Sequence, residues 1–325
     1  MLEDFAPAAP ADQLKGLSKS EVAETISQIS KLHAKYRGRV VEASELKKWV
    51  LRQNDDFYYT AVLKELRKKA SAVEAVMTGD LQLKPKQFQD MMNVVNWLVT
   101  NGDLYLRFVC NSFKRVNKNM FPSTLVHGDL RGENILFAQQ HMDEFMLFDF
   151  QLMKELNGVN DIEYLIASSM TVSERRKHER DLLVLYYNEM KKRGASDLTW
   201  EELLLTYPMA HTVLAIVTCF AVVDNITGEG KNDPKTRAIS IEYVLRTNAA
   251  CEDWNVMASL NYIPKKLHED NTIDRMTYKE QLEVVPEIYC DLLEGGGTSI
   301  TSSKNDDDDG DDGASDVKDV VLNTK

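Results

Sequence analysis

Several side chains that can take part in acid–base and metal chemistry lie within the stretch LVHGDLRGENILF. They are His127, Asp129, Arg131 and Asn134, and a further carboxylate, Asp149, follows shortly after them. Phosphoryl transfer from a nucleotide needs a carboxylate that accepts or orients the proton of the attacking hydroxyl, and a cation near the transferring group. It also needs hard oxygen ligands for magnesium. The residue types in this stretch meet each of these needs.

The spacing of these residues matches a protein-kinase catalytic loop, which reads H-R-D-L-x-x-x-N and is followed by D-F-G. His127, Asp129 and Asn134 keep the offsets of that loop, and 149–151 read D-F-Q. Two motifs in this order around an apolar hairpin favour a phosphotransfer loop over an ordinary polar turn. However, Gly128 replaces the arginine, and no A-P-E follows. The chain is therefore not an ordinary protein kinase.

The motifs H-G-D-x-x-x-x-N, D-F-Q and D-x-x-Y-L together resemble the aminoglycoside phosphotransferase–choline kinase superfamily, and most closely its CHK-kinase-like (ecdysteroid-kinase-like) members. This resemblance implies a protein-kinase-like fold with ATP and Mg²⁺ as cofactors. It implies that Asp129 is the catalytic base and that Asn134 and Asp149 are magnesium ligands. It further implies that His127 braces the loop and that Arg131 approaches the γ-phosphate.

Other positions receive weaker assignments from the same resemblance. Asp161 stands where the family has an aspartate that supports the catalytic loop, although it could equally cap the helix that follows. Gln151 fits the D-F-Q variant of the family, with no chemical step assigned to it. Glu3 and Asp4 would lie at the hinge, where backbone groups meet adenine, and their side chains are interpreted as simple linker acids.

The resemblance also leads us to expect a missing N-terminal lobe. Members of the superfamily begin with a small sheet that carries a phosphate-covering loop and a lysine, and no such strand precedes Glu3. Because positioning supplies most of the catalysis in phosphoryl transfer, we expect the chain alone to be slow or inactive. A truncated gene product is the favoured explanation, and a lobe supplied by another chain or a degenerate relative remains open.

The pattern of apolar residues predicts an α+β fold that is predominantly helical, a kinase-like C-lobe with a small catalytic hairpin. Residues 1–17 are expected to be a hinge or linker, 18–294 the phosphotransferase domain, and 295–325 a disordered acidic tail, because the tail lacks large apolar groups. The strands STLV, NILF and FMLF are expected around the loop, the last two as a hairpin. Helices are expected near 19–36, 43–54, 56–78, 85–100, 102–116, 173–194, 199–207, 212–226, 236–250 and 275–294. Ser18 with Glu21 predicts a capping box, Ser173 is expected to cap its helix, and the segment that begins at Thr199 is also expected to be capped. The sequences TGD and NGD are expected to break the helices between 56 and 116.

Composition excludes several classes of protein. The formal net charge of −12 and the absence of a basic stripe argue against a nucleic-acid partner. The N-terminus lacks the pattern of a signal peptide. The longest apolar run, residues 212–223, is too short to span a bilayer and is interpreted as a buried core helix. Four scattered cysteines predict free thiols in a reducing compartment, so we expect a cytoplasmic protein. The acidic tail is interpreted as solvated, with docking on a basic partner as the weaker alternative.

Two functions follow as hypotheses. The first is an ATP- and Mg²⁺-dependent phosphotransferase that acts on a small-molecule hydroxyl, with its acceptor pocket between the helices after Asp161 and the 43–116 region. A choline-like acceptor would need aromatic and acidic residues, an aminoglycoside several acids, and a steroid an apolar cleft, and the sequence leaves these open. The alternative is a catalytically inactive, pseudokinase-like binding or interaction protein.

Overall fold

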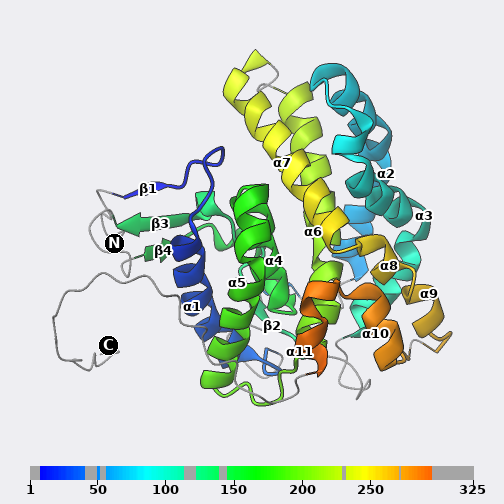
Figure 1. Cartoon of the computed structure of the whole chain (residues 1–325). Coiled ribbons are helices and arrows are strands. Elements are labelled where there is room, and N and C mark those ends of the chain that lie inside the picture. The colour runs from blue at the N-terminus through cyan, green and yellow to red at the C-terminus, as the bar shows by residue number, and fades with distance from the viewer. Residues whose placement is uncertain are drawn as a thin grey trace.

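Helices make up most of the chain, and two small antiparallel sheets lie among them (Figure 1). The computed structural model describes residues 8–40, 50–51, 56–112, 122–138, 145–228, 232–270 and 272–294. The longer helices are α1 (Lys19–Tyr36), α2 (Asp56–Ala75), α3 (Gln89–Ser112), α4 (Val159–Ser169), α5 (Val172–Lys192), α6 (Trp200–Thr227) and α7 (Pro234–Asp253). The shorter helices are α8 (Val256–Leu260), α9 (Ile263–Lys266), α10 (Tyr278–Val284) and α11 (Cys290–Glu294). The predominantly helical α+β class predicted from the sequence is confirmed.

Local capping signals fix where several helices begin. Ser18 and Glu21 form a capping box at the start of α1, so the predicted helix 19–36 is confirmed. Thr199 caps α6 as predicted, since its side chain accepts from the backbone N–H of Glu202. The predicted cap of α5 was wrong by two residues, because Thr171 and not Ser173 accepts the capping hydrogen bond.

A three-stranded sheet, ordered β1-β3-β4, holds the hairpin predicted from the sequence. Its strands are β1 (Ala8–Pro10), β3 (Ile135–Ala138) and β4 (Phe145–Leu147). The hairpin β3–β4 is confirmed, and β1 pairs antiparallel with β3. Part of the segment interpreted as a linker, residues 1–17, is therefore a strand of this sheet.

A second sheet pairs β2 (Thr124–Val126) with β5 (Lys154–Leu156) in antiparallel register. The sequence predicted β2 but not β5. All three residues of β5 are buried, so the strand lacks the alternation of polar and apolar residues that reveals a half-buried strand. Leu51 forms a parallel bridge with Lys154, so the end of the helix predicted at 43–54 is wrong. Most of that predicted helix lies outside the described residues.

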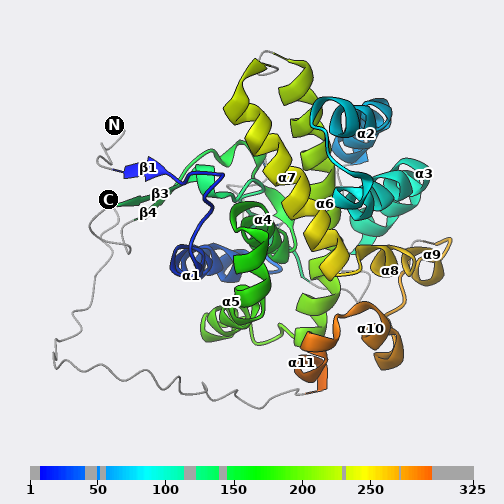
Figure 2. The same cartoon turned by 45° about the horizontal axis from the view of Figure 1, so that its top comes forward.

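The helix α6 runs between the two sides of the molecule. It contacts α4 on one side and α2 and α3 on the other, and Figures 1 and 2 both show it between the sheet side and the α2–α3 side. Its 28 residues continue through Pro208, where the sequence predicted two separate helices. A proline inside a helix costs about 3 kcal/mol, and burial of the surrounding residues offsets that cost.

The continuous helix also changes the membrane argument. The whole helix α6 is long and apolar enough to cross a bilayer. The prediction that its apolar run is too short to do so was therefore wrong. However, 67% of its most apolar window is buried inside the fold, which is typical of a core helix. The prediction that this run is a buried core helix is confirmed.

The α2–α3 region differs from its prediction in detail. The α-helical part of α2 stops at Ala75 and continues as a π-helical turn, Val76–Asp80. The break expected at the sequence NGD is only a kink at Asn101 within the continuous helix α3. The sequence predicted one helix near 275–294, whereas the structure has two, α10 and α11, on either side of a turn at Pro286. The short helices α8 and α9 were not predicted. The acidic tail, 295–325, lies outside the described residues.

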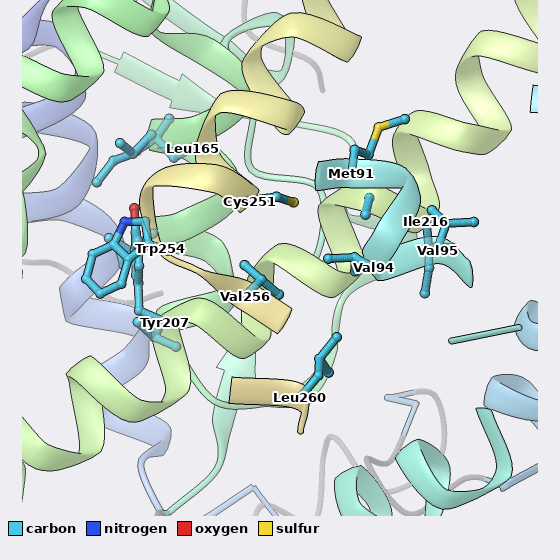
Figure 3. Packing of buried hydrophobic residues seen from close by; sticks show 14 of the residues in the cluster. Met91, Val94, Val95, Leu165, Tyr207, Ile216, Cys251, Trp254, Val256 and Leu260 are labelled. Atoms are coloured by element: carbon cyan, nitrogen blue, oxygen red, sulfur yellow. The ribbon is translucent and has the colours of Figure 1, made fainter. Parts of the chain in front are cut away.

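A large apolar core holds α4 in place. Figure 3 shows Leu165 of α4 near Tyr207 of α6 and Trp254 at the end of α7, and all of them are almost completely buried. The rings of Tyr207 and Trp254 lie 4.7 Å apart, and Trp254 stacks on Tyr289 at 4.6 Å. Because α4 carries Asp161, this core fixes the position of a candidate site residue.

Candidate active site

The loop between β2 and β3 brings two of the predicted site residues into direct contact. Asn134 ends a short 3₁₀ turn, and its amide nitrogen donates to the Asp129 backbone carbonyl at 2.8 Å and to its carboxylate at 2.9 Å. Asp129 is only 8% exposed. The carboxylate is thus held in one orientation by the residue five positions later.

Asp161 supports this loop from α4. Its carboxylate accepts the backbone N–H of His127 at 2.7 Å and that of Gly128 at 2.9 Å, and His33 of α1 lies 3.1 Å from it. Gly158, and not Asp161, is the N-cap of α4, and the Asn157 side chain accepts the backbone N–H of Val159 at the start of that helix at 2.9 Å. Of the two interpretations left open by the sequence, the geometry favours support of the loop.

The backbone conformation and the close packing of the loop require glycine at position 128. Its φ of +83° lies in the left-handed region, and a Cβ there would lie 2.2 Å from the backbone oxygen of Leu152. Only glycine fits both constraints. The replacement of the protein-kinase arginine by Gly128 is therefore a requirement of this loop.

His127 connects the loop to the end of the hairpin. Its Nε2 lies 2.9 Å from the backbone oxygen of Phe148, and its Nδ1 accepts the backbone N–H of Asp129 at 3.3 Å. These partners require a proton on Nε2 and none on Nδ1, which is the neutral tautomer. The imidazole is completely buried and packs on the Phe150 ring at 4.6 Å. Its position is consistent with a bracing role.

The hairpin register brings Asp149 to the same end as Asn134. Ile135 pairs with Leu147, and the backbone N–H of Phe148 donates to the backbone oxygen of Asn134 at 3.2 Å. Asp149 is exposed and adopts φ 64° and ψ 56°, a left-handed conformation that aspartate tolerates better than most residues. Strained residues of this kind gather at functional sites. Gln151 reaches back to the Asp149 carboxylate at 3.4 Å.

Arg131 lies among partners that orient its guanidinium. It donates to the Tyr243 hydroxyl at 3.2 Å, pairs with Glu133 at 3.0 Å, and has its Nε 3.4 Å from the Asp129 carboxylate. Burial opposes the charge, but Tyr243 and Asp129 raise the pKa of Arg131 above its usual value. Its guanidinium is therefore fixed beside the carboxylate.

Three residues near Asp129 were not singled out from the sequence. Tyr164 hydrogen-bonds Asp129, and burial raises the pKa of its phenol, so it stays protonated and donates. Tyr243 orients Arg131, and Lys154 lies on β5 within electrostatic reach of Asp129. Tyr164 was visible as the tyrosine of D-x-x-Y-L. Nothing local marked Lys154 or Tyr243.

The donor groups of Asn134 and Asp149 fit a magnesium ion. The Asn134 amide nitrogen donates to Asp129, which leaves the amide oxygen as a ligand, and Asp149 presents an exposed carboxylate. Magnesium prefers oxygen ligands and usually takes few of them from protein, because it keeps water and phosphate oxygens. Within the described part of the chain no group of three or more His, Cys, Asp or Glu residues could hold a metal. Two protein ligands with nucleotide phosphates suit this site.

A cavity of about 310 Å³ opens next to the loop. Gly128, Lys154 and Asn160 lie at its loop end, and α2, α3, α6 and the segment 262–276 supply the rest of its wall. The wall is mostly aliphatic and aromatic, with Tyr59, Val62, Tyr105, Phe108, Met209 and Phe220 among its residues. Glu3 and Asp4, predicted at the adenine hinge, lie outside the described residues.

The helical fold, the loop and the hairpin define a kinase-like protein, and comparison with known families agrees. The model of the ecdysteroid kinase-like family matches residues 1–196, so the chain belongs to that family. The resemblance inferred from the sequence is confirmed, and with it a kinase-like phosphotransferase of small molecules as the general class. A comparison with curated proteins finds no match. The matched region contains the loop, the hairpin and α4, whereas α6 and the later helices follow it.

Proposed function

We propose that this protein transfers the γ-phosphoryl group of ATP, with Mg²⁺, to a hydroxyl of a lipophilic small molecule. One observation carries the proposal. The Asp129 carboxylate, held by Asn134, belongs to the same loop that lines one end of the large apolar cavity. An acceptor in that cavity can present a hydroxyl to the carboxylate.

Each residue of the site has a separate role in this proposal. Asp129 accepts the proton of the acceptor hydroxyl, and Tyr164 and Asn134 keep its carboxylate in position. Asn134 and Asp149 would hold Mg²⁺, which when bound neutralises charge on the phosphates. Arg131 supplies a fixed positive charge beside Asp129. Asp161 and His127 keep the loop in shape.

The cavity wall favours an apolar acceptor over the other two that the sequence left open. A choline-like cation needs acidic as well as aromatic residues, and an aminoglycoside needs several acids that are not already paired. Two acids that line the cavity already face basic partners. Glu201 lies 3.6 Å from Arg275, and Asp274 lies 2.8 Å from His268. A steroid-like alcohol suits the remaining wall.

The test is an ATP-dependent phosphorylation assay with a sterol alcohol, a long-chain alcohol, choline and an aminoglycoside as acceptors. We expect transfer to the lipophilic alcohols, and we expect Asp129→Asn to lower kcat by about 10²–10⁴-fold because general base catalysis is lost. Asp181→Asn, at an exposed position on α5, is the matched control and should leave kcat unchanged. Transfer that Asp129→Asn does not slow would contradict the assignment.

The alternative, a binding protein without catalysis, rests on the cavity alone. The cavity wall includes neither Asn134 nor Asp149, so a ligand could occupy it without any phosphoryl transfer. Binding of the lipophilic alcohol by calorimetry, together with no ADP formation by nucleotide-bound, folded protein, would favour this alternative.

A further inference from the structure

The segment between β1 and α1, residues 11–17, is bonded to the loop between β2 and β3 and to the end of α4. The backbone N–H of Ala11 donates to the Gly132 carbonyl at 3.4 Å, and that of Leu17 donates to the Ser169 carbonyl at 2.7 Å. The Ser169 hydroxyl in turn accepts the backbone N–H of Gly132 at 2.9 Å. Both ends of this segment are therefore fixed relative to the loop.

A buried arginine of α7 fixes the middle of the same segment. Arg246 donates from Nη2 to the backbone oxygen of Gln13 at 2.8 Å and from Nη1 to that of Ser168 at 2.8 Å. Its side chain is only 3% exposed. Tyr243 precedes Arg246 by about one turn of α7. The backbone of Gln13 is thus held where its side chain reaches Tyr243.

The Tyr243 hydroxyl joins this segment to Arg131. It accepts the Gln13 amide N–H at 3.1 Å and the Arg131 Nη1 N–H at 3.2 Å. A hydroxyl oxygen has two lone pairs, and both are used here. Burial raises the pKa of Tyr243, so its phenol stays uncharged at neutral pH. The three side chains also line a small cavity of about 10 Å³, which has room for one water molecule.

Two carboxylates compete with Tyr243 for the Arg131 guanidinium. Asp129 lies 3.4 Å from its Nε, and Glu133 lies 3.0 Å from its Nη1. Opposite charges attract strongly in partly buried surroundings, and Tyr243 offers Nη1 an uncharged acceptor instead. Nη2 makes no hydrogen bond within the described part of the chain, and the side chain is 30% exposed. Nη2 is therefore available to an anion that enters the site.

We propose that Tyr243 and Gln13 are positioning residues for the phosphoryl donor, because they hold Arg131 so that its Nη2 faces the γ-phosphate of ATP. The transferring group must lie next to the hydroxyl that faces Asp129, and Arg131 lies beside that carboxylate. Hydrogen bonds between arginine and phosphate depend on the planar geometry of the guanidinium, so its rotation toward the carboxylates would weaken them. This inference rests on the proposed function for the identity of the donor.

The test is calorimetry on the full chain with Mg²⁺ and either ATP or ADP, in the absence of any acceptor. We expect the wild type to bind ATP more tightly than ADP. Tyr243→Phe should weaken ATP binding about tenfold, because a hydrogen bond to a charged group is lost, and should leave ADP binding nearly unchanged. Tyr187→Phe removes the hydroxyl of a ring that stacks on Trp200 at 4.1 Å, and as the matched control it should keep both affinities.

A double-mutant cycle tests whether Tyr243 acts through Arg131. Residues that act as one unit have non-additive effects. Arg131→Met should lose the preference for ATP, and the addition of Tyr243→Phe to it should weaken ATP binding no further. Gln13→Leu, at a half-buried position, should weaken ATP binding by a smaller factor than Tyr243→Phe. Thermal melts verify that each variant is folded, and Gln13→Leu carries the test if Tyr243→Phe does not fold.

Three results would overturn the inference. They are a wild type that binds ATP no more tightly than ADP, a Tyr243→Phe variant that keeps the wild-type preference or weakens both nucleotides equally, and additive losses in the double variant. The measurement needs neither an acceptor nor phosphoryl transfer. A chain that shows the expected nucleotide binding but phosphorylates no alcohol would therefore contradict the proposed function alone.

Discussion

At the scale of single residues, Asp161 joins three parts of the fold through one carboxylate. It accepts a backbone N–H of the loop between β2 and β3 and contacts His33 of α1, and His33 in turn contacts the Tyr186 hydroxyl of α5 at 3.1 Å. Burial alone would raise the pKa of Asp161, but the hydrogen bond and charge of His33, together with the Gly128 N–H, hold it below its usual value. The charged form is therefore the one that stabilises the folded state.

This direction gives a prediction for pH dependence. A carboxyl whose folded pKa is depressed adds stability above its unfolded pKa, and that stability is lost as pH falls through the folded value. We expect Asp161→Asn to lower the free energy of unfolding at pH 7 by about 2–4 kcal/mol. We also expect the variant to lose less stability than the wild type below about pH 4, measured by urea denaturation across pH.

The control for this prediction is Asp181→Asn, since the Asp181 side chain is 59% exposed and pairs with a surface lysine. It should cost less than about 1 kcal/mol. An acid unfolding curve of Asp161→Asn parallel to that of the wild type would show that the carboxylate does not contribute as described.

Site residues could be predicted where their spacing in the sequence carries the geometry. His127, Asp129 and Asn134 share one loop, so their spacing alone predicts a phosphotransfer motif. Their individual roles remain predictions. His33 and Tyr243 reach the site from helices far away in the chain. Their contacts depend on tertiary packing, which leaves no local signal in one sequence.

At the scale of elements, a buried ion pair ties α1 to α6. Arg37, just after α1, donates to the Glu202 carboxylate at 2.8 Å, and Asn157 donates to the same carboxylate at 3.0 Å. The Arg37 and Glu202 side chains are 9% and 4% exposed. This pair fixes α1, and with it His33, against the helices that follow the loop.

Removal of one partner of this pair should therefore lower the free energy of unfolding substantially. Arg37→Met leaves Glu202 buried without its counter-charge, so we expect a loss of about 3–5 kcal/mol in the free energy of unfolding. Lys19→Met breaks the exposed pair with Asp181 and should cost less than about 1 kcal/mol. Chemical denaturation of both variants provides the measurement, and equal losses would contradict the argument.

Elements were predictable where local chemistry decides them. The caps at Ser18 and Thr199 were sufficient to predict where α1 and α6 begin, and the two apolar runs were sufficient to predict the hairpin. Each of these signals lies within a few residues of the sequence. The continuity of α6 through Pro208 was not predictable, since burial against other helices outweighs the local penalty. The strand β5 was missed for a similar reason, because its pairing with β2 joins residues far apart in the chain.

At the scale of the whole molecule, the large cavity lies between parts of the chain that are far apart in sequence. The loop and β5 close one end, α2 and α3 supply one wall, and α6 supplies another. A ligand in this position contacts all of these parts at once. Its binding energy therefore adds to the stability of the folded state as a whole.

Saturation with a long-chain alcohol such as 1-decanol should raise the melting temperature by about 5 °C, because a ligand at about 100 times its Kd stabilises the folded state by about 2.7 kcal/mol. Val213→Trp should abolish this shift, since Val213 lines the cavity and a larger ring fills it. Leu282→Trp, at a position on α10 that is 38% exposed, is the control and should keep the shift. A shift that survives Val213→Trp would place the ligand elsewhere.

The left-handed backbone at Asp149 has a consequence for protein engineering. Glycine would relieve a strain of about 1 kcal/mol at this position, so a screen that ranks variants by melting temperature would promote Asp149→Gly. The same step would discard the carboxylate proposed to hold magnesium. Selection for thermal stability and selection for phosphoryl transfer thus favour different residues here, and any stabilising redesign should keep position 149 unchanged.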